Sequence, residues 1–169
     1  GMRNTMMVEG PLVPASAAAK YDLAGTRLPD TRNDTPGAGN IYASVHDLAL
    51  FGIFHLGVDH PEIVSAAGRH LMRSYVEPGA LYPYYDSSRY GLGWYFRDDG
   101  SDSVVWHEGG MPGASTILVL LPEGGVSVAV AINANDRNDL AQKVANALIA
   151  IVARSGPFSF DATAGFTRY

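Results

Sequence analysis

The second half of the chain alternates apolar, strand-like runs with short polar turns, which predicts two β-hairpins in succession. The runs are rich in aliphatic and aromatic residues, and the turns are rich in glycine, aspartate and proline. The strands are expected at residues 90–96, 103–106, 114–121 and 126–133, with turns at 98–102 (DDGSD) and 122–125 (PEGG).

The segment 106–113 (WHEGGMPG) lies between the two hairpins. His107 is therefore expected at the end of a strand, with Gly109 and Gly110 close behind it. Histidine titrates near neutral pH, and glycine lets a ligand approach the backbone closely. This segment consequently has the features of a binding or catalytic site.

Helices are expected outside the hairpins. Ser44 is the predicted N-cap of the first helix, which runs to about Gly57 with Asp47 near the positive end of the helix dipole. Because its residues are mostly apolar, this helix is expected to be buried on more than one face. Pro61 suits the first position of a second helix, which is expected to end near Tyr75.

The last helix is expected from Asp136 to Arg154. It carries four large apolar residues at helical spacing and is expected to pack across one face of the sheet. These residues are Leu140, Val144, Leu148 and Ile151.

Together the elements predict an α+β fold, in which an antiparallel β-sheet carries the C-terminal helix on one face and a small helical layer is separate. Residues 1–20 are interpreted as an N-terminal extension, 21–154 as the domain and 155–169 as a tail. Residues 21–29 alone predict a short hairpin with a glycine turn.

The composition excludes several classes of function and of binding site. The net charge of −5 argues against nucleic-acid binding, and no basic cluster is present. The absence of cysteine excludes a disulfide framework and a zinc–thiolate site. No apolar run approaches the roughly 18 residues of a membrane span. We expect no metal and no cofactor.

Four ordered segments resemble the serine β-lactamase-like hydrolases, a family that includes class C β-lactamases, penicillin-binding D-alanyl-D-alanine peptidases and related esterases. Residues 39–51 (GNIYASVHDLALF) are similar to the family's Gly-Gly-Leu-x-Ser-Thr-x-x-Asp-Leu-x-x-Phe segment. Residues 90–94 (YGLGW), then 107–113 (HEGGMPG), then the strand pair ending near Asn133 follow in the family's order. The resemblance covers about residues 21–154 and implies a partial β-lactamase/transpeptidase-like fold.

The resemblance also implies site residues. His107 would hold the first position and Gly109 the third of the family's Lys-Thr-Gly or His-x-Gly motif, and the Gly110 N–H would be an oxyanion donor. Substrate-binding candidates are Glu108, Met111, Tyr84 and Tyr85.

Each candidate has a structural alternative. His107 is otherwise a hydrogen-bonded histidine at a strand end, Glu108 a solvated side chain, and the glycines simple turn residues. Asp47 is interpreted as a helix-start residue. Tyr82, Tyr84, Tyr85 and Trp94 either line a cleft or pack against the core. The remaining histidines, interpreted as surface or capping residues, are His46, His55, His60 and His70.

Two family motifs are absent from the chain. Ser-x-x-Lys, which carries the nucleophile and base, has no match, because Lys20 follows Ser16 by four positions and Lys143 is the only other lysine. Neither Tyr-x-Asn nor Ser-x-Asn occurs. The chain therefore resembles the C-terminal half of the family's domain and is expected to be inactive alone.

Three hypotheses follow. The first is a β-lactamase-related serine hydrolase acting on a β-lactam, a D-alanyl peptide or an ester, represented by its C-terminal half. The second is a non-catalytic ligand-binding or regulatory module derived from that fold. The third, hydrolysis by His107 and Glu108 with water or metal, is ranked last because adjacent strand residues point to opposite faces.

The resemblance has consequences for partners and location. In relatives the preceding segment would join the sheet beside residues 126–133. Without it the sheet has an unpaired edge, so we expect a homo-oligomer or the N-terminal half to cover that edge. Relatives are often periplasmic or extracytoplasmic, although no secretory signal is evident in this sequence.

Overall fold

The computed structural model describes residues 1–8, 13–31, 36–57, 60–74, 89–98 and 103–152. Its centre is a five-stranded antiparallel sheet in the order β5-β6-β7-β8-β9. The strands are β5 (Arg89–Tyr90), β6 (Tyr95–Asp98), β7 (Ser103–Met111), β8 (Ala114–Leu121) and β9 (Val126–Ile132). Both predicted hairpins are present, as β6–β7 and β8–β9, and the α+β class is confirmed. The single strand expected at residues 90–96 is wrong, because the chain turns at residues 91–94 and forms β5 and β6 instead.

Smaller elements precede the sheet. Strand β1 pairs with β4 and β2 pairs with β3, both antiparallel. The pair β2–β3 and then a 3-10 turn lie between β1 and β4 in the chain. Their bounds are β1 (Thr5–Met7), β2 (Lys20–Tyr21), β3 (Arg27–Leu28), the 3-10 turn (Pro36–Ala38) and β4 (Ile41–Ala43). The hairpin expected at residues 21–29 is thus the pair β2–β3, with Gly25 at a positive φ of 83°.

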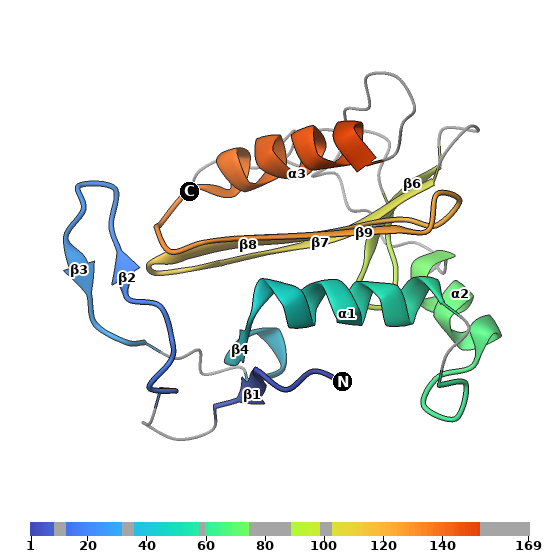
Figure 1. Cartoon of the computed structure of the whole chain (residues 1–169), viewed down its shortest axis with the longest axis horizontal. Coiled ribbons are helices and arrows are strands. Elements are labelled where there is room, and N and C mark those ends of the chain that lie inside the picture. The colour runs from blue at the N-terminus through green and yellow to red at the C-terminus, as the bar shows by residue number, and fades with distance from the viewer. Residues whose placement is uncertain (9–12, 32–35, 58–59, 75–88, 99–102, 153–169) are drawn as a thin grey trace.

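Helices cover both faces of the sheet. Helix α3 (Asn138–Val152) lies on one face, and α1 (Val45–Leu56) lies on the other, with α2 (Ala66–Ser74) beside its end (Figure 1). Among the described residues, no helix has the length and hydrophobicity needed to cross a membrane.

Helix α3 buries a different stripe from the one expected. Its small residues Ala141 and Ala145, together with Ile149, are fully buried against β7, β8 and β9. The four larger apolar residues instead remain between 39% and 75% exposed. Both stripes have helical spacing, but the alanines let the helix approach the sheet closely. The exposed residues are Leu140, Val144, Leu148 and Ile151.

Helix α1 begins as predicted, because the Ser44 side chain accepts a hydrogen bond from the Asp47 N–H at 3.1 Å. Only one side of this helix is buried, since Val45 is 47% and Ile53 is 49% exposed. The expectation that α1 is buried on more than one face is therefore wrong. Gly52 faces the sheet, where an added Cβ would lie 2.0 Å from the Ser127 hydroxyl oxygen. A glycine is needed at this close approach.

Asp47 does more than start the helix. Its buried carboxylate accepts hydrogen bonds from the Asn4 N–H at 2.6 Å and the Thr5 hydroxyl at 2.8 Å. Burial alone would raise the pKa of Asp47, but the hydrogen bonds from Thr5 and Asn4 outweigh it and lower the pKa. This carboxylate holds β1 against the start of α1. The domain boundaries at residues 20 and 154 stay predictions.

The second helix starts later than expected. Residues 61–63 form a turn, and α2 begins at Ala66, where the Ser65 hydroxyl accepts a hydrogen bond from the Gly68 N–H at 3.1 Å. The serine cap, rather than Pro61, determines the start. Tyr75 and the predicted tail at 155–169 lie outside the described residues.

Candidate functional site

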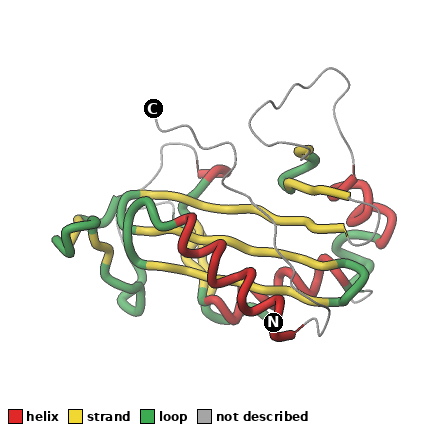
Figure 2. The backbone as a smooth tube through the Cα atoms, turned by 90° about the horizontal axis from the view of Figure 1, so that it is seen from above, coloured by secondary structure: helices red, strands yellow, loops and turns green. Residues whose placement is uncertain are grey.

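Strand β7 is paired with its two neighbours over different parts of its length. Its first part, Ser103–Trp106, pairs with β6, whereas Val105–Met111 pairs with β8. Residues 107–111 therefore have no strand on the β6 side among the described residues, and we call this stretch the open edge (Figure 2). The expectation that the strand ends near His107 is wrong, since β7 continues through both glycines to Met111.

The turn after β7 determines which backbone groups face the open edge. Met111 pairs with Ala114 across Pro112 and Gly113, and the φ of Gly113 is 78°, which fits a type II turn. Residues flanking a two-residue turn form a hydrogen-bonded pair, and such pairs alternate along an antiparallel ladder. The N–H and C=O of Gly110 consequently point away from β8, toward the open edge.

The two glycines of the strand have different surroundings. A Cβ at Gly109 would lie 2.6 Å from the Thr116 hydroxyl oxygen, so packing favours glycine there. A Cβ at Gly110 would meet nothing closer than the Asn138 side chain at 3.7 Å, which is an ordinary contact. Packing does not demand glycine at 110.

His107 lies at the start of the open edge and contacts two tyrosines. Its Nε2 is 3.2 Å from the Tyr90 hydroxyl, and its ring centroid is 5.7 Å from that of Tyr95. The ring is open to solvent on one side, yet the surrounding protein atoms remove part of its hydration and lower its pKa, against a smaller raising effect of the Glu108 backbone. A lowered pKa makes the imidazole neutral at neutral pH.

The other predicted residues are not gathered around the His107 ring. Strand alternation places His107 and Glu108 on opposite faces, which leaves the two without a shared reaction centre. Met111 is half-buried at the end of β7, next to the turn. Tyr82, Tyr84 and Tyr85 lie outside the described residues.

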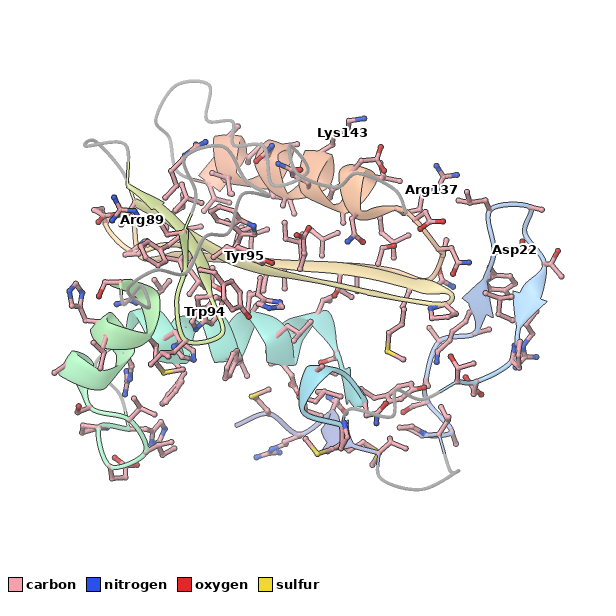
Figure 3. The ribbon with its side chains drawn as sticks, turned by 180° about the vertical axis from the view of Figure 1, so that it is seen from behind. Asp22, Arg89, Trp94, Tyr95, Arg137 and Lys143 are labelled. Carbon is pink, nitrogen blue, oxygen red and sulfur yellow. The ribbon has the colours of Figure 1, made fainter. Side chains whose placement is uncertain are left out.

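Trp94 belongs to the core rather than to a cleft. It is 3% exposed and packs with Phe96, Val105, Leu118 and Leu120 on the α1 side of the sheet. Its neighbour Tyr95 lies on the α3 side (Figure 3). The core alternative for Trp94 is the one that the structure supports.

One of the four other histidines is not on the surface. His55 is 2% exposed between the rings of Phe51 and Trp94, whereas His46, His60 and His70 are exposed. The histidine is buried because α1 turns it toward the sheet. Across the described ranges, no group of three or more histidine, aspartate or glutamate side chains is placed to hold a metal.

Sequence reasoning did not single out Tyr90 as a site residue. The residue lies 17 positions before His107, on a strand two places removed from β7. The register supplies the link, because Tyr90 pairs with Tyr95 and Tyr95 pairs with Trp106, the residue before His107. Only the paired strands bring the hydroxyl to the imidazole.

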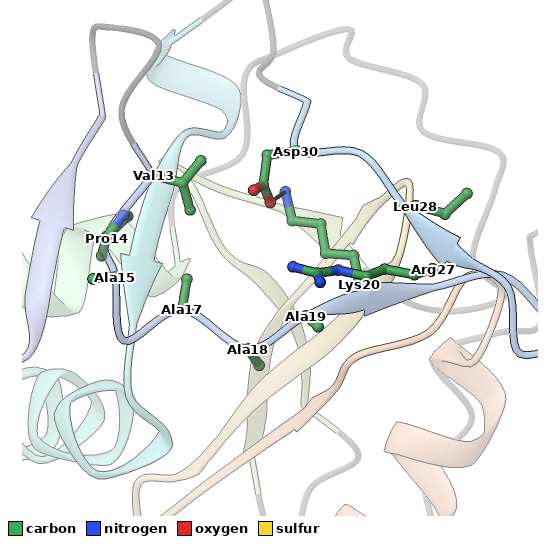
Figure 4. A pocket seen from close by; sticks show the side chains of 10 residues that line it. All are labelled: Val13, Pro14, Ala15, Ala17, Ala18, Ala19, Lys20, Arg27, Leu28 and Asp30. Atoms are coloured by element: carbon green, nitrogen blue, oxygen red, sulfur yellow. Dashed lines mark ion pairs between the residues drawn. The ribbon is translucent and has the colours of Figure 1, made fainter.

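A separate cavity of about 240 Å³ lies beside the β2–β3 hairpin (Figure 4). The nearly buried Lys20 ammonium donates to the Tyr42 hydroxyl at 2.9 Å and lies 3.7 Å from the Asp30 carboxylate. Lys20 also lies against Gly113, where an added Cβ would be 2.3 Å from the lysine Cβ. The lysine thus attaches the hairpin to the β7–β8 turn.

The family model of the β-lactamases (Beta-lactamase) matches residues 1–153. The chain belongs to the β-lactamase family. In this family member, the segment that resembles the third motif is strand β7 with its open edge. A comparison with the curated proteins finds no match.

Solved structures agree with the family. The octameric penicillin-binding protein homologue from Pyrococcus abyssi is similar with a TM-score of 0.70 and 22% identity over 92% of this chain and 35% of that chain. The D-amino acid amidase from Ochrobactrum anthropi SV3, complexed with D-phenylalanine, has a TM-score of 0.64 and 21% identity over 89% of this chain and 50% of that chain. The penicillin-binding protein from Bacillus halodurans has a TM-score of 0.63 and 17% identity over 87% of this chain and 44% of that chain.

These likenesses show a shared fold, namely a partial β-lactamase/transpeptidase-like fold. The chain spans 35% to 50% of the length of these three proteins. Through its family and its fold, the chain is related to serine hydrolases.

Proposed function

We propose that this chain provides the substrate-binding strand of a serine hydrolase that acts on a β-lactam, a D-alanyl peptide or an ester. The open edge of β7 carries the proposal, because it presents the Gly110 N–H and C=O to an extended ligand. His107 takes the first position of the third motif and Gly109 the third. Two of the similar structures are a D-stereospecific amidohydrolase and a D-amino acid amidase, which supports an acyl substrate with a D-residue.

In the proposed mechanism, the Gly110 N–H donates to the oxyanion that forms when a nucleophile attacks the acyl carbon. Such preorganised donors act where charge develops in the transition state. Met111, Glu108, Tyr84 and Tyr85 remain the proposed substrate contacts.

The chain itself carries no Ser-x-x-Lys, so the proposed acyl transfer needs a nucleophile from a segment outside this sequence. Two serines near the sheet have structural bonds. Ser115 is buried, donates to the Ala134 carbonyl at 2.9 Å and accepts from the Arg137 N–H at 2.9 Å, and Ser127 donates to the Ala49 carbonyl at 3.1 Å.

Intact-mass spectrometry after incubation with a fluorescent penicillin and, separately, with a fluorophosphonate tests the missing nucleophile. We expect no adduct with either reagent. A stoichiometric adduct on a serine would show that the chain has a nucleophile of its own.

Backbone amide NMR tests the binding strand. N-acetyl-D-alanyl-D-alanine and benzylpenicillin are expected to shift the amide signals of Gly109 and Gly110.

A matched pair of variants tests the Gly110 N–H as a hydrogen-bond donor. Gly110→Pro removes an N–H that is not part of the ladder and should weaken binding about tenfold, whereas Gly110→Ala keeps the N–H and should bind normally. Unchanged amide signals in β7, or equal binding by both variants, would refute the proposed strand.

The second candidate is a non-catalytic ligand-binding or regulatory module, which the absence of Ser-x-x-Lys specifically favours. Both candidates predict binding at β7, and they differ once the rest of the family's domain is supplied. A hydrolase acquires acylation when a protein with Ser-x-x-Lys is added, and a binding module does not.

We also propose that a second copy, or the N-terminal half of the family's domain, covers the β9 edge. Strand β9 ends the sheet in the described part of the chain, apart from a short bridge to Tyr21. The exposed stripe of α3, from Leu140 to Ile151, is a further uncovered apolar surface. The Pyrococcus abyssi relative is itself octameric. A monomer in sedimentation at micromolar concentration would count against self-assembly.

A further inference from the structure

We propose that Tyr90 is a positioning residue that holds the His107 ring in one orientation at the open edge of β7. The proposal rests on the proposed function for the catalytic relevance of His107, but the contact itself does not. The Tyr90 hydroxyl lies 3.2 Å from Nε2 of His107, within hydrogen-bond distance.

Packing places the Tyr90 hydroxyl. The Tyr90 ring lies edge-on against Tyr95, with 4.5 Å between the centroids and 61° between the planes. Tyr95 is in turn stacked on Trp106 at 5.7 Å and 21°, and Trp106 is 2% exposed in the core below α3. The buried tryptophan therefore supports a row of rings that ends at the imidazole.

The contact holds the ring whichever way the hydrogen bond runs. A phenol hydroxyl both donates and accepts, so Tyr90 donates to an Nε2 that carries no proton and accepts from one that does. The contact therefore restrains the orientation of the ring in both neutral tautomers and in the charged form.

This restraint has a consequence for the site. The imidazole keeps one position at the start of the open edge, three residues before Gly110.

The test is Tyr90→Phe, which keeps the ring and removes only the hydroxyl. The orientation of His107 is read by NMR from the three-bond couplings that report χ1 and from the ring nitrogen signals of the chain with 15N-labelled histidine, with His107→Gln to assign the signals. In Tyr90→Phe we expect the population of the ring orientation that faces residue 90 to fall about fivefold relative to the other rotamers. Charged side chains on the neighbouring strands, Arg89, Arg97 and Glu108, are unchanged.

Tyr21→Phe is the matched control, because it removes a tyrosine hydroxyl from β2, in a different sheet. It should leave the His107 ring signals unaltered. If Tyr90 acted only through the packing of its ring, Tyr90→Phe would leave His107 unaffected. Ring signals identical to those of the unchanged chain would therefore overturn the proposal.

A second arm separates this proposal from the proposed function. Binding of N-acetyl-D-alanyl-D-alanine should weaken about fivefold in Tyr90→Phe while the ligand still shifts the Gly109 and Gly110 amides. If the unchanged chain does not bind the peptide, the proposed function fails, and the ring spectra still decide whether Tyr90 positions His107.

Discussion

Protonation of the buried His55 should make the protein unstable in mild acid. The side chain is 2% exposed and its Nδ1 has no hydrogen-bond partner. Burial is the main cause that lowers the pKa of His55 to about 4, and the positive charges of Arg73 and Arg69 lower it further. The ring is neutral in the folded state at neutral pH.

The sign of the pH dependence follows from proton uptake. The unfolded chain binds this proton near the ordinary pKa of 6.5, but the folded protein binds it only near pH 4. Stability from this residue is thus complete above about pH 6.5 and is lost as the pH falls toward 4. The difference of about 2.5 in pKa corresponds to about 3 kcal/mol in total, of which about 2.5 kcal/mol is lost by pH 4.5.

Urea unfolding between about pH 7.5 and pH 4.5, followed by tryptophan fluorescence, measures this loss. Trp94 is a local reporter, since its ring centroid is 5.0 Å from that of His55. His55→Phe removes the titrating group, and the exposed His70→Gln is the control. The unfolding free energy of the unchanged chain should fall more steeply than that of His55→Phe, and in parallel with His70→Gln. Equal slopes for the unchanged chain and His55→Phe would refute the reasoning.

Two glycine substitutions test the close approaches in the fold. Gly52→Ala forces a methyl group to within 2.0 Å of the Ser127 hydroxyl oxygen and should lower the unfolding free energy by about 2 kcal/mol, with part of the loss recovered by adding Ser127→Ala in chemical denaturation. Gly113→Ala combines a positive φ of 78° with a contact at 2.3 Å from Lys20, and should cost about 3 kcal/mol. Gly25→Ala has the positive φ without the contact, so a cost above about 2 kcal/mol there would contradict the separation of strain from packing.

The elements with local causes were predictable from the sequence. Both hairpins follow from alternating runs around glycine-rich turns, and α1 begins at the serine whose side chain caps it. These features depend on residues a few positions apart, so the local sequence determines them without contacts from distant segments. The segment that resembles the family's third motif, and the missing Ser-x-x-Lys, were found by comparing the sequence with the family's motifs.

Tertiary structure decided how these elements meet. Helical spacing allowed two apolar stripes on α3, and close packing on the sheet selected the alanine stripe. The Asp47 carboxylate acquired partners 42 and 43 residues away, and His55 was turned into the core rather than toward solvent. The open edge of β7 and the Tyr90–His107 contact both arise from where β6 stops pairing. Such features depend on register and packing between distant segments, which no local pattern specifies.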